Sequence, residues 1–370
     1  MKIVNAKVFV DGKFTDGGIE FDETIKSVGP EVNGAGDIDA GGAYIIPGLV
    51  DIHAHSAVNE DSSDGSLEGL AKMSRYYASN GVTSWCPTTM TFSEEILTNA
   101  LHAARDFSRP ADGARIAGIN LEGPFISYEK RGAQNPAYIM DPDADMFDRL
   151  NEASGGIVRI ITIAPETEGA IEFTKRVSKT AVVSIGHTTA DYDTAMAAYD
   201  AGASHTTHLF NAMPPLHHRD PGVIAAAFDS GSTIEMIVDG FHSHPAVVRL
   251  THQLFGERMV LISDSTRCTG MPDGEYELGG QPTTMKDGKA YIKGTNTIAG
   301  STINLMDGLL RSHKFGLTLE ESVKAATIIP AKVIGQDKYI GSLEAGKYAD
   351  LVIMTPELDI KNVYINGKAR

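Results

Sequence analysis

The sequence predicts an α/β protein, a (β/α)₈ TIM-like barrel with a small β-sandwich domain built from both chain termini. Eight apolar, β-rich runs alternate with helical stretches along the middle of the chain, as in a barrel. Both chain ends instead resemble short strands joined by tight turns, and histidine and carboxylate residues recur where the barrel strands would end. No G-x-G-x-x-G follows the first strand, which disfavours an open dinucleotide-binding sheet.

The two ends of the chain share one turn signal. Asp11-Gly12 follows the alternating run KIVNAKVFV, and Asn366-Gly367 interrupts the run KNVYINGKAR. Asp-Gly and Asn-Gly are preferred central residues of a two-residue hairpin. We therefore predict a small β domain from residues 1–46 and 336–370, and a barrel from residues 47–335.

The middle of the chain supplies the strands and helices of the barrel. The predicted strands lie near Val50, Ser84, Ile119, Ile161, Val183, Thr207, Ile237 and Leu261. Their spacing is that of a βα unit, and their continuous apolar character suits parallel strands covered on both faces. Helices are predicted at residues 66–80, 93–107, 190–202, 244–255 and 318–328. Thr318 and Glu321 have the spacing of a capping box for the last of these helices.

A glycine-rich insert, residues 265–300, separates the eighth strand from the next helix. Asp287-Gly288 predicts a hairpin within this insert. The segments that leave the carboxyl ends of barrel strands lie at the barrel mouth. We therefore expect the insert to overhang the mouth.

Composition limits the partners of the protein. The formal net charge of −16 disfavours nucleic acid and anionic membranes, because both are polyanions. The start MKIVNAKVFVDGKF lacks the apolar segment of a signal peptide, and two cysteines are too few for a disulfide framework. These features predict a cytoplasmic protein in which Cys86 and Cys268 are inert.

Potential metal ligands follow several of the predicted strands. They are His53, His55, Glu122, His187, His208 and Asp264. The first two are two residues apart, so their side chains point the same way and can face one ion. A single histidine at a strand end is more often a hydrogen-bonded core residue than a ligand. All of these residues belong to the face of the barrel that carries active sites, and this conjunction favours a metal centre.

Other histidines are interpreted as structural. His205 lies three residues before His208 and should point to the opposite face of its strand, so we expect it to pack against helices. His217 and His218 lie in a proline-rich loop, where we expect them to be solvated.

Longer motifs indicate a family resemblance. They are LEGPF at residues 121–125, GAQNP at 132–136, GHT at 186–188, THLFNAM at 207–213, DGFH at 239–242 and SDS at 263–265. With these motifs in order over essentially the whole chain, the sequence resembles the N-acetylglucosamine-6-phosphate deacetylases of the amidohydrolase superfamily. LEGPF and HLFNAM are specific to that family, whereas His-x-His is shared across the superfamily.

The resemblance implies a metal-dependent hydrolase with one or two divalent ions per subunit, namely Zn, Fe, Mn or Co. The positions that match the main metal site are Glu122, His187 and His208, and those that match the second site of binuclear members are His53 and His55. Glu122 would bridge the two sites. Asp264 matches the catalytic acid and base.

The resemblance also implies substrate contacts. The matching positions are Asn211, the Ala212 backbone and Arg219 at the phosphate, His242 at the sugar, and Ala133, Ile298, Ala299 and Gly300 around them. Arg219 would supply the local positive charge that a phosphate site needs on an acidic protein. Gln134 stands where many members have a histidine that helps to hold the acetyl carbonyl. Glutamine keeps a hydrogen-bond donor but cannot be cationic.

The implied reaction belongs to amino-sugar catabolism. It is hydrolysis of N-acetyl-D-glucosamine 6-phosphate to D-glucosamine 6-phosphate and acetate. The resemblance also implies a homodimer, in which the partner subunit can supply a ligand to the phosphate. A deacetylase for the galactosamine isomer remains an open alternative. A dihydroorotase-like cyclic amidase usually bridges two metals with a carboxylated lysine after strand four, where this chain has IITIAPE. A non-catalytic scaffold should have lost ligands, and this chain keeps them all.

Overall fold

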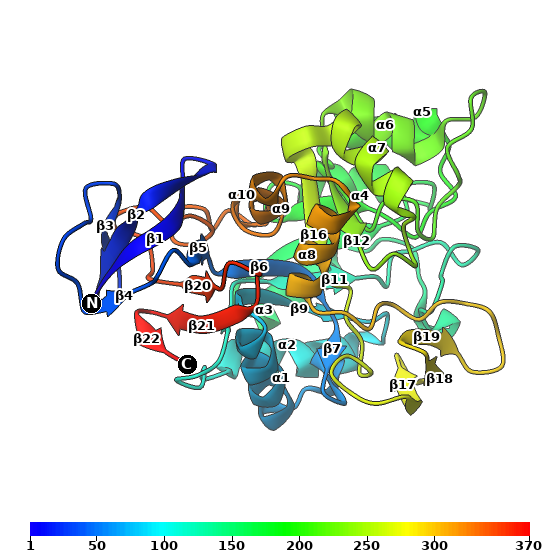
Figure 1. Ribbon diagram of the computed structural model, residues 1–370. Helices are drawn as coiled ribbons and strands as arrows, with labels where there is room; N and C mark the ends of the chain where they lie inside the picture. The colour runs from blue at the N-terminus through cyan, green and yellow to red at the C-terminus, as the bar shows by residue number, and fades with distance from the viewer.

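The computed structural model describes residues 1–370 and confirms the predicted barrel (Figure 1). Its parallel strands follow one another in chain order around the ring, with the short β10 (Arg115–Ile116) beside β9. They are β6 (Leu49–Ala54), β9 (Val82–Thr89), β11 (Ile119–Glu122), β12 (Val158–Ile163), β13 (Val182–Ile185), β14 (His205–Thr206), β15 (Thr233–Ile237) and β16 (Met259–Ile262). Every predicted strand position falls in one of these strands except Thr207, which directly follows β14.

The ring closes between β16 and β6 through backbone hydrogen bonds at the barrel mouth. The N–H of Asp264 donates to the carbonyl of His53 at 2.9 Å, and the N–H of His55 donates to the carbonyl of Ser265 at 3.1 Å. Elsewhere β6 pairs with β9 alone. The seam of the barrel is therefore held by residues that the sequence marks as metal ligands.

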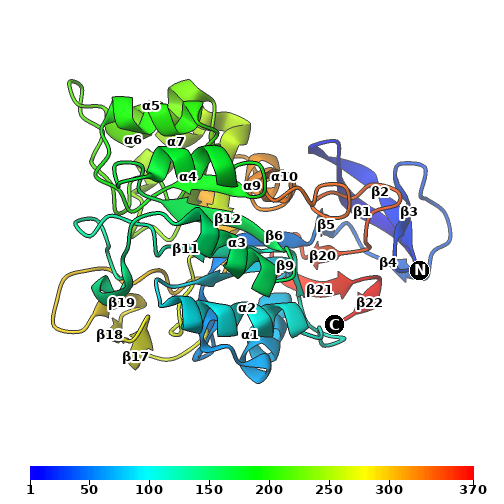
Figure 2. The same ribbon diagram turned by 180° about the vertical axis from the view of Figure 1, so that it is seen from behind.

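Helices cover the outside of the barrel (Figures 1 and 2). The α-helices are α1 (Leu67–Ser79), α2 (Glu94–Asp106), α3 (Ala144–Ala153), α4 (Ala170–Val177), α5 (Tyr192–Asp200), α6 (Gly222–Ser230), α7 (Pro245–Phe255), α8 (Leu305–Phe315), α9 (Leu319–Ala325) and α10 (Ile328–Val333). The 3₁₀ helices are η1 (Ser62–Asp64), η2 (Pro136–Tyr138) and η3 (Gly256–Arg258). The predicted helices are all present, although the last is divided between α9 and α10. The predicted capping box of Thr318 and Glu321 begins α9.

The two chain ends form one mixed sheet in the order β22-β21-β20-β5-β1-β2-β3, with β4 beside β1. Its strands are β1 (Lys2–Val10), β2 (Lys13–Phe21), β3 (Ile25–Gly29), β4 (Ile38–Asp39), β5 (Tyr44–Pro47), β20 (Leu351–Met354), β21 (Ile360–Ile365) and β22 (Lys368–Ala369). The rings of Phe21 on β2 and Tyr364 on β21 lie 5.4 Å apart, although three strands separate β2 from β21 in the sheet order. The sheet therefore folds back on itself as a sandwich around its own apolar core.

Both predicted terminal hairpins are present. Asp11 and Gly12 join β1 to β2 with φ of 49° and 76°, and Asn366 and Gly367 join β21 to β22 with φ of 48° and 71°. These left-handed values are those of a type I′ turn. The terminal sheet lies on the side of the barrel away from the long loops of the mouth (Figure 1). Arg115 of β10 pairs with Asp350 and links this sheet to the barrel.

The predicted insert carries a three-stranded sheet of β17 (Gly274–Leu278), β18 (Gln281–Lys286) and β19 (Lys289–Ile292). Asp287 and Gly288 form the turn between β18 and β19. Figures 1 and 2 place this sheet on the mouth side, beside the loops that follow the barrel strands. A smaller hairpin of β7 (Ser56–Ala57) and β8 (Glu60–Asp61) follows β6. None of the helices is both long and apolar enough to span a bilayer.

Candidate active site

A cavity of about 280 Å³ lies at the barrel mouth. Its wall includes all of the predicted metal ligands except His53, which lies beneath it. The predicted substrate-binding residues on the wall are Ala133, Gln134, Asn211, Ala212, His242, Ile298 and Gly300. Leu278, Asn296 and Thr297 of the insert also line the cavity. The insert therefore forms one side of the cavity, as its position after strand eight predicted.

One group of side chains gathers Glu122, His187 and His208 from three strand ends. Glu122 Oε1 lies 2.9 Å from His208 Nε2 and 3.2 Å from His187 Nε2, and the two ring nitrogens are 3.1 Å apart. All three residues are buried. Neutral imidazoles gain nothing from such proximity of two lone pairs, whereas shared ligation of a cation brings them together in this way.

A second group gathers His53, His55 and Asp264 beside the first. Asp264 Oδ1 lies 3.4 Å from His55 Nε2 and 3.7 Å from His53 Nε2. Glu122 joins the two groups, since its Oε2 lies 3.1 Å from His55 Nε2 and its Oε1 lies 3.4 Å from His53 Nε2. Glu122 thus lies between the two groups, in the position that the family resemblance implies for a bridging residue.

The outer nitrogens of the imidazoles show that the residues present fit a divalent cation. Nδ1 of His53 contacts Glu235 at 2.9 Å, Nδ1 of His55 contacts the Thr88 carbonyl at 3.2 Å, and Nδ1 of His187 contacts the Lys130 carbonyl at 2.9 Å. Each of these oxygens accepts a hydrogen bond from an N–H at Nδ1, which leaves the Nε2 lone pair facing the cluster. Metal-binding histidines are oriented by this arrangement.

The backbone of three cluster residues is left-handed. His187, His208 and Asp264 have φ of 47°, 27° and 47°. Side-chain-bearing residues rarely adopt this region, and strain of this kind persists where surrounding contacts hold it. Each of these residues lies two positions after the last residue of a barrel strand, so the turn redirects its side chain over the mouth.

Charge pairing within the cluster shifts the pKa values of its members in opposite directions. Burial disfavours the charged form of His53, but Glu235 and Glu122 outweigh it and raise the pKa of His53 to about 9. Burial also opposes ionisation of Glu122, but His187 and His53 hold the pKa of this carboxyl well below its usual range. Cation binding to His53 must therefore displace its proton, and rising pH favours this binding.

No sequence pattern indicated Glu235, and the prediction that His205 packs against helices was wrong. Glu235 on β15 is completely buried, with Oε2 at 2.9 Å from His53 Nδ1 and Oε1 at 3.2 Å from His205 Nε2. His205 therefore faces the barrel interior and does not pack against helices. The chain leaves β14 after Thr206, and the left-handed turn at His208 breaks the alternation of faces on which the prediction rested.

Gln134 is fixed from both ends of its amide. Its Oε1 accepts from the N–H of Thr91 at 2.7 Å, and its Nε2 donates to Glu122 Oε2. One hydrogen of the amide NH₂ is therefore engaged with the bridging carboxylate, and the second remains available to the cavity.

The outer end of the cavity contains donors suited to an anion. Ala212 has a φ of 51°, and its N–H makes no hydrogen bond within the chain. Asn211 is next to it, with its side-chain amide directed to the carbonyls of His208 and Leu209. His242 is anchored through Nδ1 to Asp239 at 2.6 Å, which leaves its Nε2 for the cavity.

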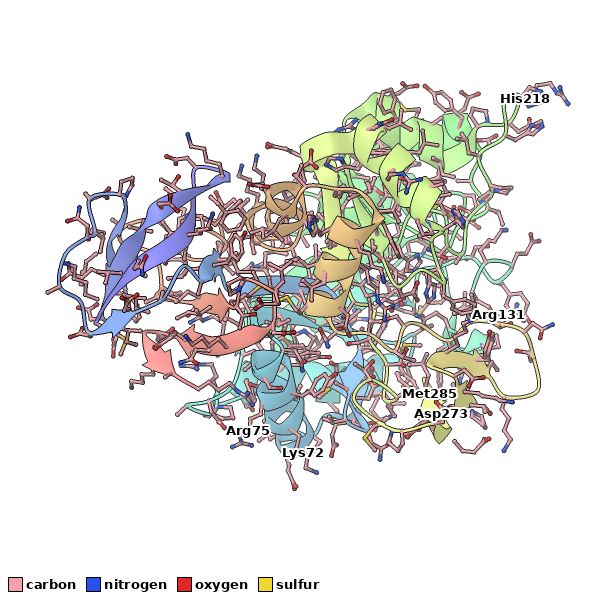
Figure 3. All side chains as sticks on the ribbon, viewed as in Figure 1. Lys72, Arg75, Arg131, His218, Asp273 and Met285 are labelled. Carbon is pink, nitrogen blue, oxygen red and sulfur yellow. The ribbon has the colours of Figure 1, made fainter.

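Two predicted substrate residues lie elsewhere. Arg219 is exposed in the loop before α6, where its guanidinium lies 2.7 Å from His218, and it borders a different hollow. Figure 3 shows His218 at the outer tip of this loop. Ala299 is buried in the small apolar core of the insert, between the cavity residues Ile298 and Gly300.

Comparisons with known proteins agree with this geometry. The amidohydrolase family matches residues 44–370. N-acetylglucosamine-6-phosphate deacetylase of Bos taurus is 37% identical over 344 residues, which cover 89% of this chain and 84% of that protein. N-acetylgalactosamine-6-phosphate deacetylase of Escherichia coli O157:H7 is 34% identical over 329 residues, which cover 88% of this chain and 87% of that protein. The chain also resembles a solved structure from Mycobacterium smegmatis, a mutant N-acetyl-D-glucosamine-6-phosphate deacetylase in complex with N-acetyl-D-glucosamine-6-phosphate. The TM-score is 0.94 at 34% sequence identity, and the match covers 100% of this chain and 98% of that chain.

The barrel and its buried histidine–carboxylate cluster define a metal-dependent hydrolase. The chain belongs to the amidohydrolase family, in the group of the N-acetylglucosamine-6-phosphate deacetylases and their relatives, and it is a hydrolase of amide C–N bonds. The resemblance inferred from the motifs is thereby confirmed.

Proposed function

We propose that this protein hydrolyses the acetamide of N-acetyl-D-glucosamine 6-phosphate to give D-glucosamine 6-phosphate and acetate. The observation that carries the proposal is one cavity whose wall carries both the buried histidine–carboxylate cluster and the unpaired backbone N–H of Ala212. Relatives named N-acetylglucosamine-6-phosphate deacetylase support the choice of substrate. Because a sugar phosphate is charged and does not cross membranes freely, we also propose a cytoplasmic location.

The cluster would hold one or two divalent ions, Zn, Fe, Mn or Co. Glu122, His187 and His208 would bind the first ion, and His53 and His55 would join Glu122 at the second. A bound divalent cation lowers the pKa of coordinated water to about 7 and polarises the substrate carbonyl. The chain contributes the rigid placement of these ligands, because the outer nitrogens of His53, His55 and His187 are anchored.

Asp264 would move the proton. Its carboxylate faces the cavity beside His55, and its pKa is lowered because the hydrogen bond from His55 and the charge of His53 outweigh burial. The ionised carboxylate can accept a proton from the attacking water and deliver it to the leaving amine. Acid–base help of this kind is typically worth about 10²–10⁴-fold.

The remaining wall residues would position the substrate. The free hydrogen of the Gln134 amide would donate to the acetyl oxygen, and His242 would contact the sugar. The unpaired N–H of Ala212 and the Asn211 side chain would bind the phosphate, with Ala133, Ile298 and Gly300 shaping the wall.

We also propose that the protein is a homodimer in which Arg219 serves the phosphate of a partner subunit. Within one chain this exposed guanidinium does not reach the cavity wall, although its motif position matches a phosphate ligand. Light scattering of the purified protein would test the dimer. Restored activity on mixing Arg219→Ala chains with Asp264→Asn chains would support a shared site.

A paired measurement tests the reaction. Purified protein is analysed for metal, and acetate release is followed with N-acetylglucosamine 6-phosphate and N-acetylgalactosamine 6-phosphate side by side. We expect faster turnover of the glucosamine compound. Preference for the galactosamine compound would instead establish an N-acetylgalactosamine-6-phosphate deacetylase. We keep this second candidate because the chain is 34% identical to a protein of that name. No acetate from either compound by metal-loaded protein would refute both.

A further inference from the structure

The carboxylate of Glu235 lies beneath the ligand cluster and touches both of its groups. Its Oε2 accepts from His53 Nδ1 at 2.9 Å and from the backbone N–H of His208 at 3.0 Å. Its Oε1 accepts from His205 Nε2 at 3.2 Å. Glu235 is completely buried, and a buried carboxylate is strongly destabilising unless donors surround it.

The first contact decides which nitrogen of His53 faces the cluster. An acceptor at Nδ1 places the proton there, so Nε2 keeps its lone pair. That Nε2 lies 3.3 Å from His55 Nε2 and 3.4 Å from Glu122 Oε1, where a shared ion would lie. Without Glu235, His53 has no other partner for Nδ1, and its ring could adopt the opposite tautomer.

The second contact holds a strained part of the other group. His208 has a left-handed φ of 27°, and the Glu235 carboxylate fixes its N–H while the Glu235 carbonyl accepts the N–H of Leu209 at 2.9 Å. The Nδ1 of His208 itself is buried without a partner. The position of the His208 ring therefore depends on its backbone, and that backbone depends on Glu235.

His205 keeps the carboxylate in place. Its Nε2 donates to Glu235, and its Nδ1 contacts the Thr233 hydroxyl at 2.6 Å. His205 and Thr233 face each other in the register of β14 and β15, inside the barrel. The chain of contacts thus runs from the partly buried Thr233 through the buried His205 and Glu235 to His53 in the ligand cluster.

We infer that Glu235 is a positioning residue of the metal centre, which fixes the His53 imidazole and the His208 backbone together, with His205 as its support. The inference rests on the proposed role of these residues as metal ligands, and it is independent of the substrate. Partners of this kind typically change metal affinity by about 10–100-fold when they are replaced.

The test measures Co²⁺ binding to the full-length chain after removal of bound metal. Co²⁺ affinity and stoichiometry come from chelator competition, and visible absorption reports the coordination of the bound ion. Glu235→Gln keeps the size of the side chain but removes the charge, and we expect affinity to fall by about 10–100-fold with an altered spectrum. Asp350→Asn is the matched control, because Asp350 is a buried carboxylate paired with Arg115 far from the cluster.

A second pair of variants keeps the test decisive if Glu235→Gln does not fold. His205→Leu removes the donor to Glu235 and should weaken Co²⁺ binding in the same direction, whereas His205→Gln retains an N–H donor and should restore it. Unchanged affinity in Glu235→Gln, equal affinity in the two His205 variants, or an equal loss in Asp350→Asn would each overturn the inference. If the unmodified chain binds no Co²⁺, the metal centre itself is refuted. If it binds Co²⁺ but releases no acetate, only the substrate is wrong.

Discussion

The inner and outer ends of the cavity are built in different ways. At the inner end the ligands are buried, and contacts within the chain fix most of their outer nitrogens. The phosphate site proposed at the outer end would be completed by Arg219, which is exposed on a projecting loop and does not reach the cavity wall within one chain. Buried charges are costly unless paired, so a metal centre must be assembled by folding. A phosphate contact at the surface carries no such cost and can be completed by substrate or by a second subunit.

Metal removal should have the largest effect and act on the inner end alone. Chelation of the purified protein is expected to abolish acetate release, because the cluster then lacks the group that activates water. Return of Zn²⁺, Fe²⁺, Mn²⁺ or Co²⁺ should restore turnover, and elemental analysis of the same samples gives the number of ions. Full activity in metal-free protein would show that the inner end is only structural.

Asp264→Asn separates catalysis from metal binding within the inner end. We expect turnover to fall by about 10²–10⁴-fold while metal content persists, because the amide can neither accept nor deliver the proton. Circular dichroism would check that the barrel is intact, since the backbone of Asp264 also closes the seam. Loss of metal from this variant would instead make Asp264 mainly a ligand.

Arg219→Ala tests the outer end. Loss of a charge-assisted contact to phosphate is worth roughly 1.5–3 kcal/mol, so we expect KM to rise about 10–100-fold with metal content unchanged. Arg131→Ala is a control at another arginine on the mouth side, whose guanidinium stacks on Tyr128. An identical KM in Arg219→Ala would remove this residue from the phosphate site.

The pH dependence of stability should differ between metal-free and metal-loaded protein. The folded, metal-free chain raises the pKa of His53 from 6.5 to about 9, so this histidine contributes stability that is present below pH 6.5 and is lost as pH rises through 9. Thermal unfolding of the metal-free chain should therefore shift to lower temperature over this range. The unfolding temperature of metal-loaded protein should not show this decrease, because the bound ion takes the place of the proton on His53. Parallel curves for the two forms would contradict the pairing of His53 with Glu235 and Glu122.

Sequence patterns predicted the parts of the molecule that depend on local chemistry. Asp11-Gly12, Asp287-Gly288 and Asn366-Gly367 all form the expected turns, because only certain residues tolerate the left-handed backbone there. The strand ends also brought Glu122 and His187 together as predicted, since a barrel gathers the carboxyl ends of its strands at one rim.

The sequence alone could not predict polar contacts between residues that are far apart in the chain. Glu235 lies within the apolar run STIEMIVDG, and its partner His53 is 182 residues away. No local pattern marks a buried acid whose donors come from distant strands. The sequence also could not predict where Arg219 lies, because a motif gives the order of residues and not the direction in which a loop projects.

The seam of the barrel has a consequence for how the centre forms. His53 and Asp264 join strand one to strand eight through their backbone atoms, and their side chains belong to the cluster above. The first and last strands must therefore meet before His53, His55 and Asp264 can converge. We therefore expect an incompletely folded chain to lack the second ligand group, so that occupation of that position follows closure of the barrel.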